Sequence, residues 1–345
     1  MRKKGIIMKK IYALFMILVL SVSIVGLVGC SNNSKNNQEN VEPDPVTPSP
    51  DANPENTNDA NGNDTNDTRE GKRDIIIGSK DFTESNIVAE IYCLALEENE
   101  FDVDRSYNIK NESIHDSITS DEIDIYPEYT SNALLTVLNE SIKTDVDDVY
   151  NTVKDGFKKQ YNLTVLDYAP VHDGPAFIMR ADVAKKYNIN NITELQAKAS
   201  KLNFGYTGDF LDRDTGMSLI KSVYGDINFK TSTLYDSSNR FQLLDDGKVD
   251  VIDGYTTEGS LASDKYVVIK DDKSAWPPYN IVPVVRQSVL EEYPQIAEIL
   301  NSVDKQLTTE VMRDLNNKVD NENKEVDAVA KEYFESIKGD IVIKD

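Results

Sequence analysis

One short pattern occurs twice in this chain and constrains its fold more than any other feature. Residues 124–131 read DIYPEYTS, and residues 250–257 read DVIDGYTT. Each copy is an apolar run that ends in tyrosine, threonine and a second hydroxyl residue, and each then enters a helix-like segment. We therefore expect one loop to be built twice, with Tyr129 and Tyr255 at strand ends in two different lobes. A small ligand can be held between two such lobes.

The first residues resemble a secretion signal. A basic head precedes an apolar run over residues 11–28, and Cys30 follows the sequence Leu-Val-Gly. The run is also long enough for a transmembrane helix, but a cysteine directly after these residues resembles a bacterial lipobox. Residues 1–30 are therefore predicted to be a lipoprotein signal peptide, with Cys30 lipidated as the first mature residue. Met1 and Met8 each open a complete signal, so the start stays open.

The next segment has the composition of a tether. Residues 31–73 are rich in Asn, Asp, Pro, Ser and Thr and contain no aromatic residue. Such a segment cannot bury enough apolar surface to offset the entropy cost of becoming ordered. We predict a disordered linker between the lipid anchor and a folded part that begins at Asp74.

Short apolar runs alternate with helical patterns throughout the folded part. Strands are predicted at residues 75–77, 123–125, 164–166, 176–179, 249–252, 266–269 and 281–285. Helices are predicted at residues 83–96, 114–118, 133–138, 149–161, 182–187, 192–199 and most of 295–337. This alternation predicts an α/β fold built around parallel sheets. About 270 residues exceed one comfortable core, so we expect a first lobe from residues 74–175 and 280–345 and a second from residues 176–279.

Composition argues against several classes of function. The net charge is −23 and no basic patch is visible, so nucleic acid is not an expected partner. Neither of the two histidines, His115 and His172, has a serine or cysteine partner in a catalytic pattern, and no phosphate-binding or zinc-binding spacing occurs. We predict a protein that is not an enzyme and has no cofactor and no metal. The second cysteine, Cys93, lies among aliphatic residues and is predicted to be a small buried hydrophobe.

Aromatic residues in unusual places indicate a binding site. They lie at predicted strand ends or in turns marked by glycine or proline: Tyr126, Tyr129, Tyr206, Phe210, Tyr255, Trp276 and Tyr279. Several converging rings would form a cage for a quaternary ammonium, although ordinary packing is the alternative for any single tyrosine. Thr83, Thr130 and Thr256 each precede a helix-like segment, where free N–H groups suit an anionic end and a plain N-cap is the alternative.

Several motifs resemble one known family, the osmoprotectant-binding lipoproteins of ABC importers, which take glycine betaine, carnitine or choline. The motifs occur in the family's order at residues 78–84 (GSKDFTE), 124–130 (DIYPEYT), 210–216 (FLDRDTG), 253–257 (DGYTT), 277–279 (PPY) and 283–286 (PVVR). The likeness spans residues 74 to about 338. It implies the two-lobed α/β fold of a type II periplasmic binding protein, with the ligand in the cleft between the lobes.

The resemblance also implies a set of ligand-binding residues and partners. Tyr255 and Tyr279 correspond to tyrosines of the family's cage, and Tyr129 lines its cleft. The full predicted set is Thr83, Ser85, Tyr129, Asn132, Asp173, Tyr255, Trp276 and Tyr279. The implied partners are a small quaternary-ammonium ligand, the transmembrane permease of an ABC importer, and the membrane through the lipid anchor. The implied location is the extracellular face of the cell membrane.

The chain departs from the family pattern at one wall of the cage. Residues 173–176 read DGPA where relatives have Asn-Asn-Thr-Tyr, so Pro175 or its neighbour replaces a cage tyrosine. Ser85 and Ser131 replace a glutamine and a glycine. Trp276 is the candidate to replace the missing ring. The altered wall leaves other ligands open, such as carnitine, ergothioneine or an amino acid, and an extracellular enzyme with an acidic site is the rival from another class.

Overall fold

The computed structural model describes residues 74–208 and 210–341. The predicted signal peptide at residues 1–30, its Cys30 and the predicted linker at residues 31–73 lie outside the described residues. Among the residues that are described, no helix is both long and apolar enough to cross a membrane.

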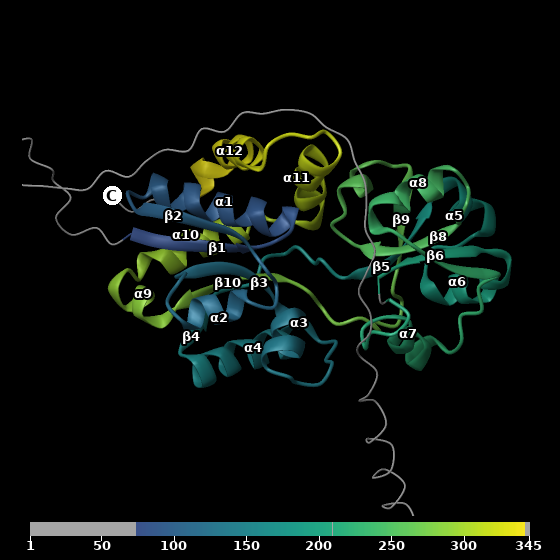
Figure 1. Ribbon diagram of the computed structural model, residues 1–345, viewed down its shortest axis with the longest axis horizontal. Helices are drawn as coiled ribbons and strands as arrows, with labels where there is room; N and C mark the ends of the chain where they lie inside the picture. The colour runs from purple at the N-terminus through teal and green to yellow at the C-terminus, as the bar shows by residue number, and fades with distance from the viewer. Residues whose placement is uncertain (1–73, 209, 342–345) are drawn as a thin grey trace, which may run out of the picture. The chain divides into compact units, whose positions relative to one another are not determined.

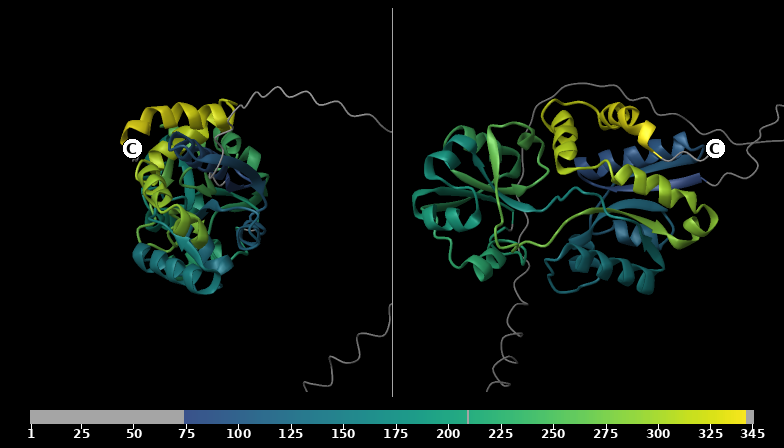
Figure 2. Two further views of the ribbon diagram at one scale, coloured as in Figure 1. Left: turned by 90° about the vertical axis from the view of Figure 1, so that its left-hand side faces the viewer. Right: turned by 180° about the vertical axis from the view of Figure 1, so that it is seen from behind.

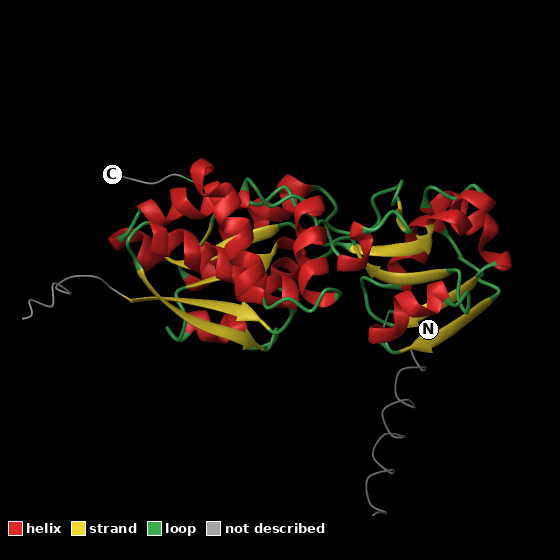
Figure 3. Cartoon of the chain, turned by 90° about the horizontal axis from the view of Figure 1, so that it is seen from above, coloured by secondary structure: helices red, strands yellow, loops and turns green. Residues whose placement is uncertain are grey.

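Two mixed sheets organise the chain, and helices flank both of them (Figures 1 and 3). The first sheet has the strand order β2-β1-β3-β10-β4. Its strands are β1 (Asp74–Lys80), β2 (Asp102–Ile109), β3 (Ile125–Tyr129), β4 (Leu163–Val165) and β10 (Ile281–Arg286). The second sheet has the order β7-β6-β8-β5-β9. Its strands are β5 (Pro175–Arg180), β6 (Asn203–Thr207), β7 (Thr231–Tyr235), β8 (Val251–Tyr255) and β9 (Tyr266–Ile269).

Helices cover both faces of the first sheet. One face packs against α1 (Thr83–Glu98), α9 (Gln287–Glu292), α10 (Gln295–Asp304), α11 (Thr309–Asp320) and α12 (Val326–Ile337). The other packs against α2 (Ile114–Thr119), α3 (Thr130–Asn132), the π-helix η1 (Ala133–Val137) and α4 (Val146–Tyr161). Side chains alternate along β10, so this strand contributes to the cores on both faces of the sheet. Ile281 and Val285 pack in the core that contains α1 and α10, and Val282 and Val284 pack in the core that contains α2 and α4.

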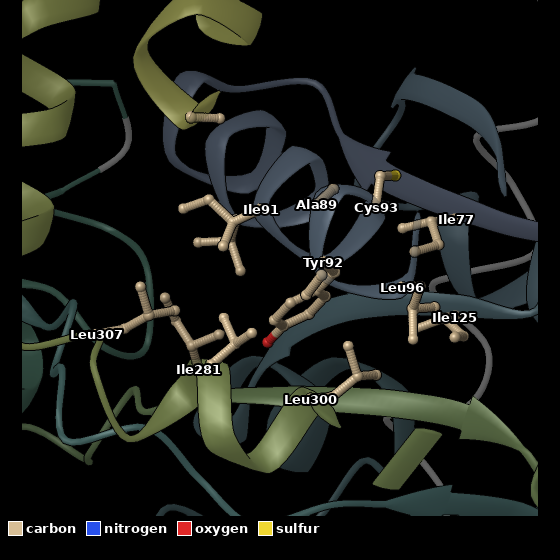
Figure 4. Packing of buried hydrophobic residues seen from close by; sticks show 14 of the residues in the cluster. Ile77, Ala89, Ile91, Tyr92, Cys93, Leu96, Ile125, Ile281, Leu300 and Leu307 are labelled. Carbon is tan, nitrogen blue, oxygen red and sulfur yellow. The ribbon is translucent and has the colours of Figure 1, made fainter. Parts of the chain in front are cut away.

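Tyr92 and Cys93 show how α1 fills the first of these cores. Both side chains are fully buried on α1, among aliphatic residues of the sheet and of α10 (Figure 4). Cys93 Sγ lies 3.2 Å from the Tyr107 hydroxyl, and burial raises the pKa of its thiol to about 12. The prediction that Cys93 is a buried hydrophobe is confirmed, because a thiol held in this way is a poor nucleophile.

The second sheet is also covered on both faces. Aromatic residues dominate one core, where Phe177 packs against Phe204, Phe210 and Trp276. The helices on this face are α5 (Ala181–Tyr187), α6 (Ile192–Lys198) and α7 (Met217–Tyr224). The opposite face packs against α8 (Arg240–Asp245) and the 3-10 helix η4 (Gly259–Ala262).

Two segments connect the sheets, and they are paired with each other. The first crossover, residues 171–174, leads into β5, and the second, residues 276–280, leads into β10 (Figure 2). His172 and Asn280 form an antiparallel bridge between them. Asp173 N donates to Tyr279 O at 3.0 Å, and Tyr279 N donates to His172 Nδ1 at 3.0 Å. The chain therefore passes between its sheets as a hydrogen-bonded pair of strands.

The prediction of parallel sheets is only partly right. β1, β2 and β3 are parallel, as are β6, β7 and β8. In each sheet, however, the strand that follows a crossover runs antiparallel to its neighbours. In the first sheet β10 is antiparallel to β3 and β4. In the second sheet β5 is antiparallel to β8 and β9. β5 begins at Pro175, one residue inside the predicted first lobe.

The predicted helices and strands are found, with shifts of a few residues at their ends, and the misses have a physical cause. Tyr206 was expected in a glycine-marked turn, but it lies within β6. The strands β2, β6 and β7 and the helices α7, α8 and α9 were not predicted. Of these strands, β2 and β7 are edge strands that alternate little between apolar and polar residues. An edge strand that exposes most of its side chains lacks the pattern that identifies a buried one.

Candidate functional site

A cleft of about 480 Å³ is lined by elements of both sheets and by both crossovers. Residues from the first sheet and its helices are Lys80, Phe82, Thr83, Glu84, Asn111, Tyr129, Asn132, Asn316 and Asp320. The second sheet and its connections contribute Arg240, Tyr255, Thr257 and Glu258, and the crossovers contribute Asp173 and Tyr279. The lining combines aromatic rings with acidic and amide side chains, which is unlike a hydrophobic core.

The repeated Tyr-Thr loops form the two sides of this cleft. Tyr129 is the last residue of β3 and Tyr255 is the last residue of β8, so each ring stands at the end of a strand in a different sheet. Tyr129 is 4% exposed, whereas Tyr255 is 37% exposed. The second ring is therefore the more accessible to a ligand.

The threonine of each copy holds the crossover that enters its own sheet. Thr130 Oγ1 donates to Pro278 O at 2.9 Å and accepts from Asn280 N at 3.1 Å. Thr256 Oγ1 accepts from Gly174 N at 3.0 Å, and Thr256 also donates to His172 O. The same loop thus performs the same structural task twice, which explains the repeat in the sequence.

Aromatic rings converge on the cleft from four places in the chain. Phe82 precedes α1, and its ring centre lies 5.7 Å from that of Tyr129. Tyr279 stands in the second crossover, and Tyr255 faces the cleft from β8. Ring faces attract a cation by about 0.5–1 kcal/mol each when exposed and about 2 kcal/mol when desolvated. Several rings around one cleft therefore suit an organic cation.

Besides the exposed Asp320, two carboxyl groups in the cleft have no basic partner among the described residues. Glu84 is 4% exposed, accepts from Tyr129 Oη at 3.0 Å and accepts from Asn316 Nδ2 at 2.8 Å. Asp173 accepts from Thr257 Oγ1 at 2.6 Å. Burial raises the pKa of both carboxyls. Repulsion by Glu84 raises the pKa of Asp173 further. A positive group in the cleft would favour their ionised forms.

The two basic residues of the cleft are already paired. Lys80 forms a buried ion pair with Glu128, and its Nζ lies 5.3 Å from the centre of the Tyr129 ring. Arg240 forms an ion pair with Glu258, which also accepts from Tyr255 N at 3.2 Å. Burial still raises the pKa of Glu258. Acidic groups therefore outweigh the basic ones on the cleft surface.

The start of α1 offers donors to an anionic group. Phe82 occupies the N-cap position and makes no side-chain cap hydrogen bond. Thr83 directs its hydroxyl to Asp320 Oδ1 at 2.7 Å. The backbone N–H groups of the first turn therefore have no side-chain cap, and Phe82, Thr83 and Glu84 line the cleft.

Most of the predicted binding residues come together here. Thr83, Tyr129, Asn132, Asp173, Tyr255 and Tyr279 all line the cleft. Ser85 does not, because it is fully buried and accepts from Lys80 N at 2.9 Å, behind the cleft wall. These positions show where the residues lie, and their contact with a ligand stays a prediction.

The structure does not bring Trp276 to the cleft as a replacement ring. Trp276 is 7% exposed, packs on Phe177 in the second sheet's core, and donates from Nε1 to Thr215 O at 2.9 Å. Pro175 does not line the cleft either, and pairs with Tyr255 between β5 and β8. Phe82, from the motif at residues 78–84, is a further ring in the cleft lining.

Sequence reasoning did not select several residues of the cleft. Phe82 and Glu84 lie within the family-like motif at residues 78–84, and Glu258 directly follows the second Tyr-Thr loop, so these had a signal nearby. Arg240 and Asn316 had none. They belong to α8 and α11, far from any motif, and only the folding of the chain places them at the cleft.

The lining combines groups that can bind a ligand. Within residues 74–208 and 210–341, no group of three or more His, Cys, Asp or Glu side chains is arranged to hold a metal. His172 accepts a backbone hydrogen bond in the crossover, and burial lowers its pKa. The cleft can neutralise a positive group with carboxyls and aromatic faces, and can offer amides and N–H groups to a polar end.

A family model matches most of the chain. Residues 73–336 match the substrate-binding domain of the ABC-type glycine betaine transport system. The carnitine transport binding protein OpuCC of Listeria monocytogenes is 28% identical over 268 residues, covering 76% of this chain and 87% of that protein. The ergothioneine transport permease/ergothioneine binding protein EgtU of Helicobacter pylori is 26% identical over 268 residues, but this chain spans only 48% of it.

Solved structures show the same fold. A glycine betaine/carnitine/choline ABC transporter structure has a TM-score of 0.73 at 25% identity, covering 77% of this chain and 99% of that one. Apo YehZ from Escherichia coli has a TM-score of 0.68, also at 25% identity, with the same coverage. These similarities confirm the two-lobed α/β fold of type II periplasmic binding proteins.

Proposed function

The chain belongs to the family of substrate-binding domains of ABC-type glycine betaine transport systems, and on this basis we propose that it binds a quaternary-ammonium compound and delivers it to an ABC importer. One observation carries the proposal. Four aromatic residues and two carboxyls without a basic partner line a single cleft. The relatives named for carnitine and glycine betaine support this ligand class.

The structure suits binding and release rather than chemistry. A cleft whose sides belong to two sheets can take up a ligand when the sheets separate and retain it when they approach, with the paired crossovers as the hinge. Delivery then requires a permease that recognises the loaded protein. We expect this protein to supply affinity and the transporter to supply the energy of uptake.

Calorimetry with a panel of ligands tests the proposed ligand class. The panel contains choline, carnitine, glycine betaine and ergothioneine, and at least one should bind with a Kd near the micromolar range, or about −8 kcal/mol. The matched control is 3,3-dimethyl-1-butanol, in which carbon replaces the choline nitrogen and removes the charge. It should bind far more weakly, because a neutral group lacks the electrostatic attraction to the ring faces and the carboxyls.

Two results would overturn the proposal. The first is equal binding of choline and its neutral carbon analogue, which would remove the role of the positive charge. The second is a silent panel together with tight binding of an uncharged amino acid. Ergothioneine belongs in the panel because one relative is named for it.

The location of the protein forms part of the same proposal. Cys30 after a basic head and an apolar run supports a lipid anchor on the extracellular face of the membrane, with residues 31–73 as its tether. Expression of Cys30→Ala in a bacterium that processes lipoproteins should abolish the incorporation of labelled fatty acid that the wild-type protein shows. A wild-type protein that is already soluble after processing would contradict the anchor.

A further inference from the structure

Glu84 and Asp173 approach the cleft from different parts of the chain and share one hydroxyl neighbour. Glu84 lies in the first turn of α1, and Asp173 lies in the first crossover. Thr257 Oγ1 donates to Asp173 Oδ1 at 2.6 Å and also interacts with the Glu84 carboxyl. The two carboxyls therefore form a pair around Thr257, which is itself only 3% exposed.

No basic group compensates this pair. Among residues 74–208 and 210–341, neither Glu84 nor Asp173 forms an ion pair, and the two basic residues of the cleft, Lys80 and Arg240, are held by Glu128 and Glu258. The charged and titratable groups around the pair are Lys80, Tyr129, His172, Arg240, Tyr255, Glu258, Tyr279 and Asp320. Arg313 of α11 lies close by as well, but its Nε donates to Thr256 O at 2.7 Å, and it forms no ion pair with Glu84 or Asp173 among the described residues.

A second, independent feature at the same place is a buried amide group with an unsatisfied oxygen. Asn316 is 95% buried, since its exposed fraction is 5%. Its Nδ2 donates to Glu84 Oε2 at 2.8 Å and to Thr257 O at 2.9 Å, while its Oδ1 has no hydrogen-bond partner among the described residues. A buried amide oxygen without a donor is costly, and Asn316 lines the cleft.

We infer that Glu84 and Asp173 select ligands of net positive charge over zwitterions, and that ligand binding releases a proton from this pair. The inference rests on the proposed function and deepens it. Aromatic faces alone attract the ammonium of choline and of glycine betaine equally. The carboxyl pair distinguishes them, because in its ionised form it repels the carboxylate of glycine betaine and attracts a ligand that is purely cationic.

Proton release follows from the environment of the pair. Burial favours the neutral form of both carboxyls in the free protein, and a bound cation favours the ionised form. At a pH below the pKa of the free pair, a proton must therefore leave when the cation binds. Affinity for choline should fall as the pH is lowered through this range, by at most about tenfold per pH unit for one proton. Above the range it should become constant.

Calorimetry with choline and glycine betaine as matched probes tests the inference. Wild-type protein should prefer choline by about tenfold or more, equivalent to about 1.4 kcal/mol. Titrations at one pH in buffers of different ionisation enthalpy count the protons released, and choline should release more than glycine betaine. Asp173→Asn keeps an oxygen that can accept from Thr257, and it should lower both the preference and the proton count.

Further variants separate this role from a structural one. Glu84→Gln should change preference and proton release in the same direction as Asp173→Asn. Asp226→Asn removes a carboxyl at an exposed position outside the residues that line the cleft, and it should change neither. Thermal denaturation of each variant shows whether it is folded. The number of protons released by wild-type protein tests the inference even if the variants do not fold.

The outcomes distinguish this inference from the proposed function. If wild-type protein binds both probes equally and releases no proton, the carboxyl pair does not select the ligand, although the proposed function stands. If Asp173→Asn and Glu84→Gln fold and retain the wild-type preference, the inference is also wrong. If no quaternary-ammonium probe binds at all, the proposed function fails and the inference fails with it.

Discussion

Gly259 lies directly against the backbone of Asn317, so that a Cβ added at Gly259 would stand 2.6 Å from the Asn317 nitrogen. Gly259 begins η4, beside the second sheet, and Asn317 lies in α11, beside the first. Arg313 Nε donates to Thr256 O at 2.7 Å in the same contact. The contact joins the two sides of the cleft where Asn316 and Thr257 also meet.

Gly259→Ala should weaken this contact. Backbone atoms cannot move aside as a flexible side chain can, so we expect a loss of about 1–3 kcal/mol in the free energy of unfolding. Urea denaturation followed by tryptophan fluorescence measures it, because Trp276 is the single tryptophan of the chain. Gly339→Ala is the matched control, since an added Cβ there meets nothing within 4 Å. Equal stabilities of the two variants would show that α11 and η4 do not pack this closely.

Tyr255→Ala should weaken binding of the best ligand by at least tenfold, or about 1.4 kcal/mol. The side chain supplies an accessible ring face, and its hydroxyl accepts from Arg213 at 3.3 Å. Tyr255→Phe is the matched variant, because it keeps the ring and removes the hydroxyl. If the ring carries the effect, the Phe variant should retain most of the affinity in calorimetry. An unchanged Kd for the Ala variant would remove Tyr255 from the site.

Trp276→Phe should lower stability and leave ligand affinity within about twofold. Trp276 packs in the second sheet's core, and its indole satisfies Thr215 O, so its replacement leaves a smaller ring and an unpaired carbonyl. We expect a cost of about 2 kcal/mol. Circular dichroism follows unfolding here, since the variant has no tryptophan. A large loss of affinity at unchanged stability would return Trp276 to the binding site.

Asp304→Asn should stabilise the protein at neutral pH. Asp304 is 1% exposed, accepts from Tyr92 Oη at 2.6 Å, and has no partner for Oδ2 among the described residues. Burial raises its pKa well above the usual range. The folded protein therefore keeps this proton at a pH at which the unfolded chain, with a pKa of about 3.9, has lost it. Stability should fall as the pH rises from about 4 towards the folded pKa.

The pH profile of stability distinguishes this mechanism from a general effect of charge. Asp304→Asn should remove the fall between acidic and neutral pH, and its oxygen can still accept from Tyr92. A carboxyl whose pKa is one unit higher in the folded state costs about 1.4 kcal/mol at neutral pH. Asp226→Asn, at an exposed position, should keep the wild-type profile. Parallel profiles for wild type and Asp304→Asn would show that Asp304 does not titrate abnormally.

Strong local patterns explain what could be predicted of the fold. Buried strands such as β1, β5 and β10 are continuous apolar runs, and α1 follows directly after a motif that begins a helix. The repeat around Tyr129 and Tyr255 correctly predicted two equivalent strand ends, because the same local sequence folds in the same way twice. These features depend on residues that are neighbours in the chain.

The sequence by itself determined the α/β class, the family and six of the eight proposed cleft residues, since each of these follows from a local motif. Only the tertiary structure decided that Trp276 packs in a core and that Arg240 and Asn316 reach the cleft. It also decided that Glu84 and Asp173 share Thr257 without a basic partner. Burial and charge pairing depend on residues that are distant in the chain, and no local pattern records which of them will meet.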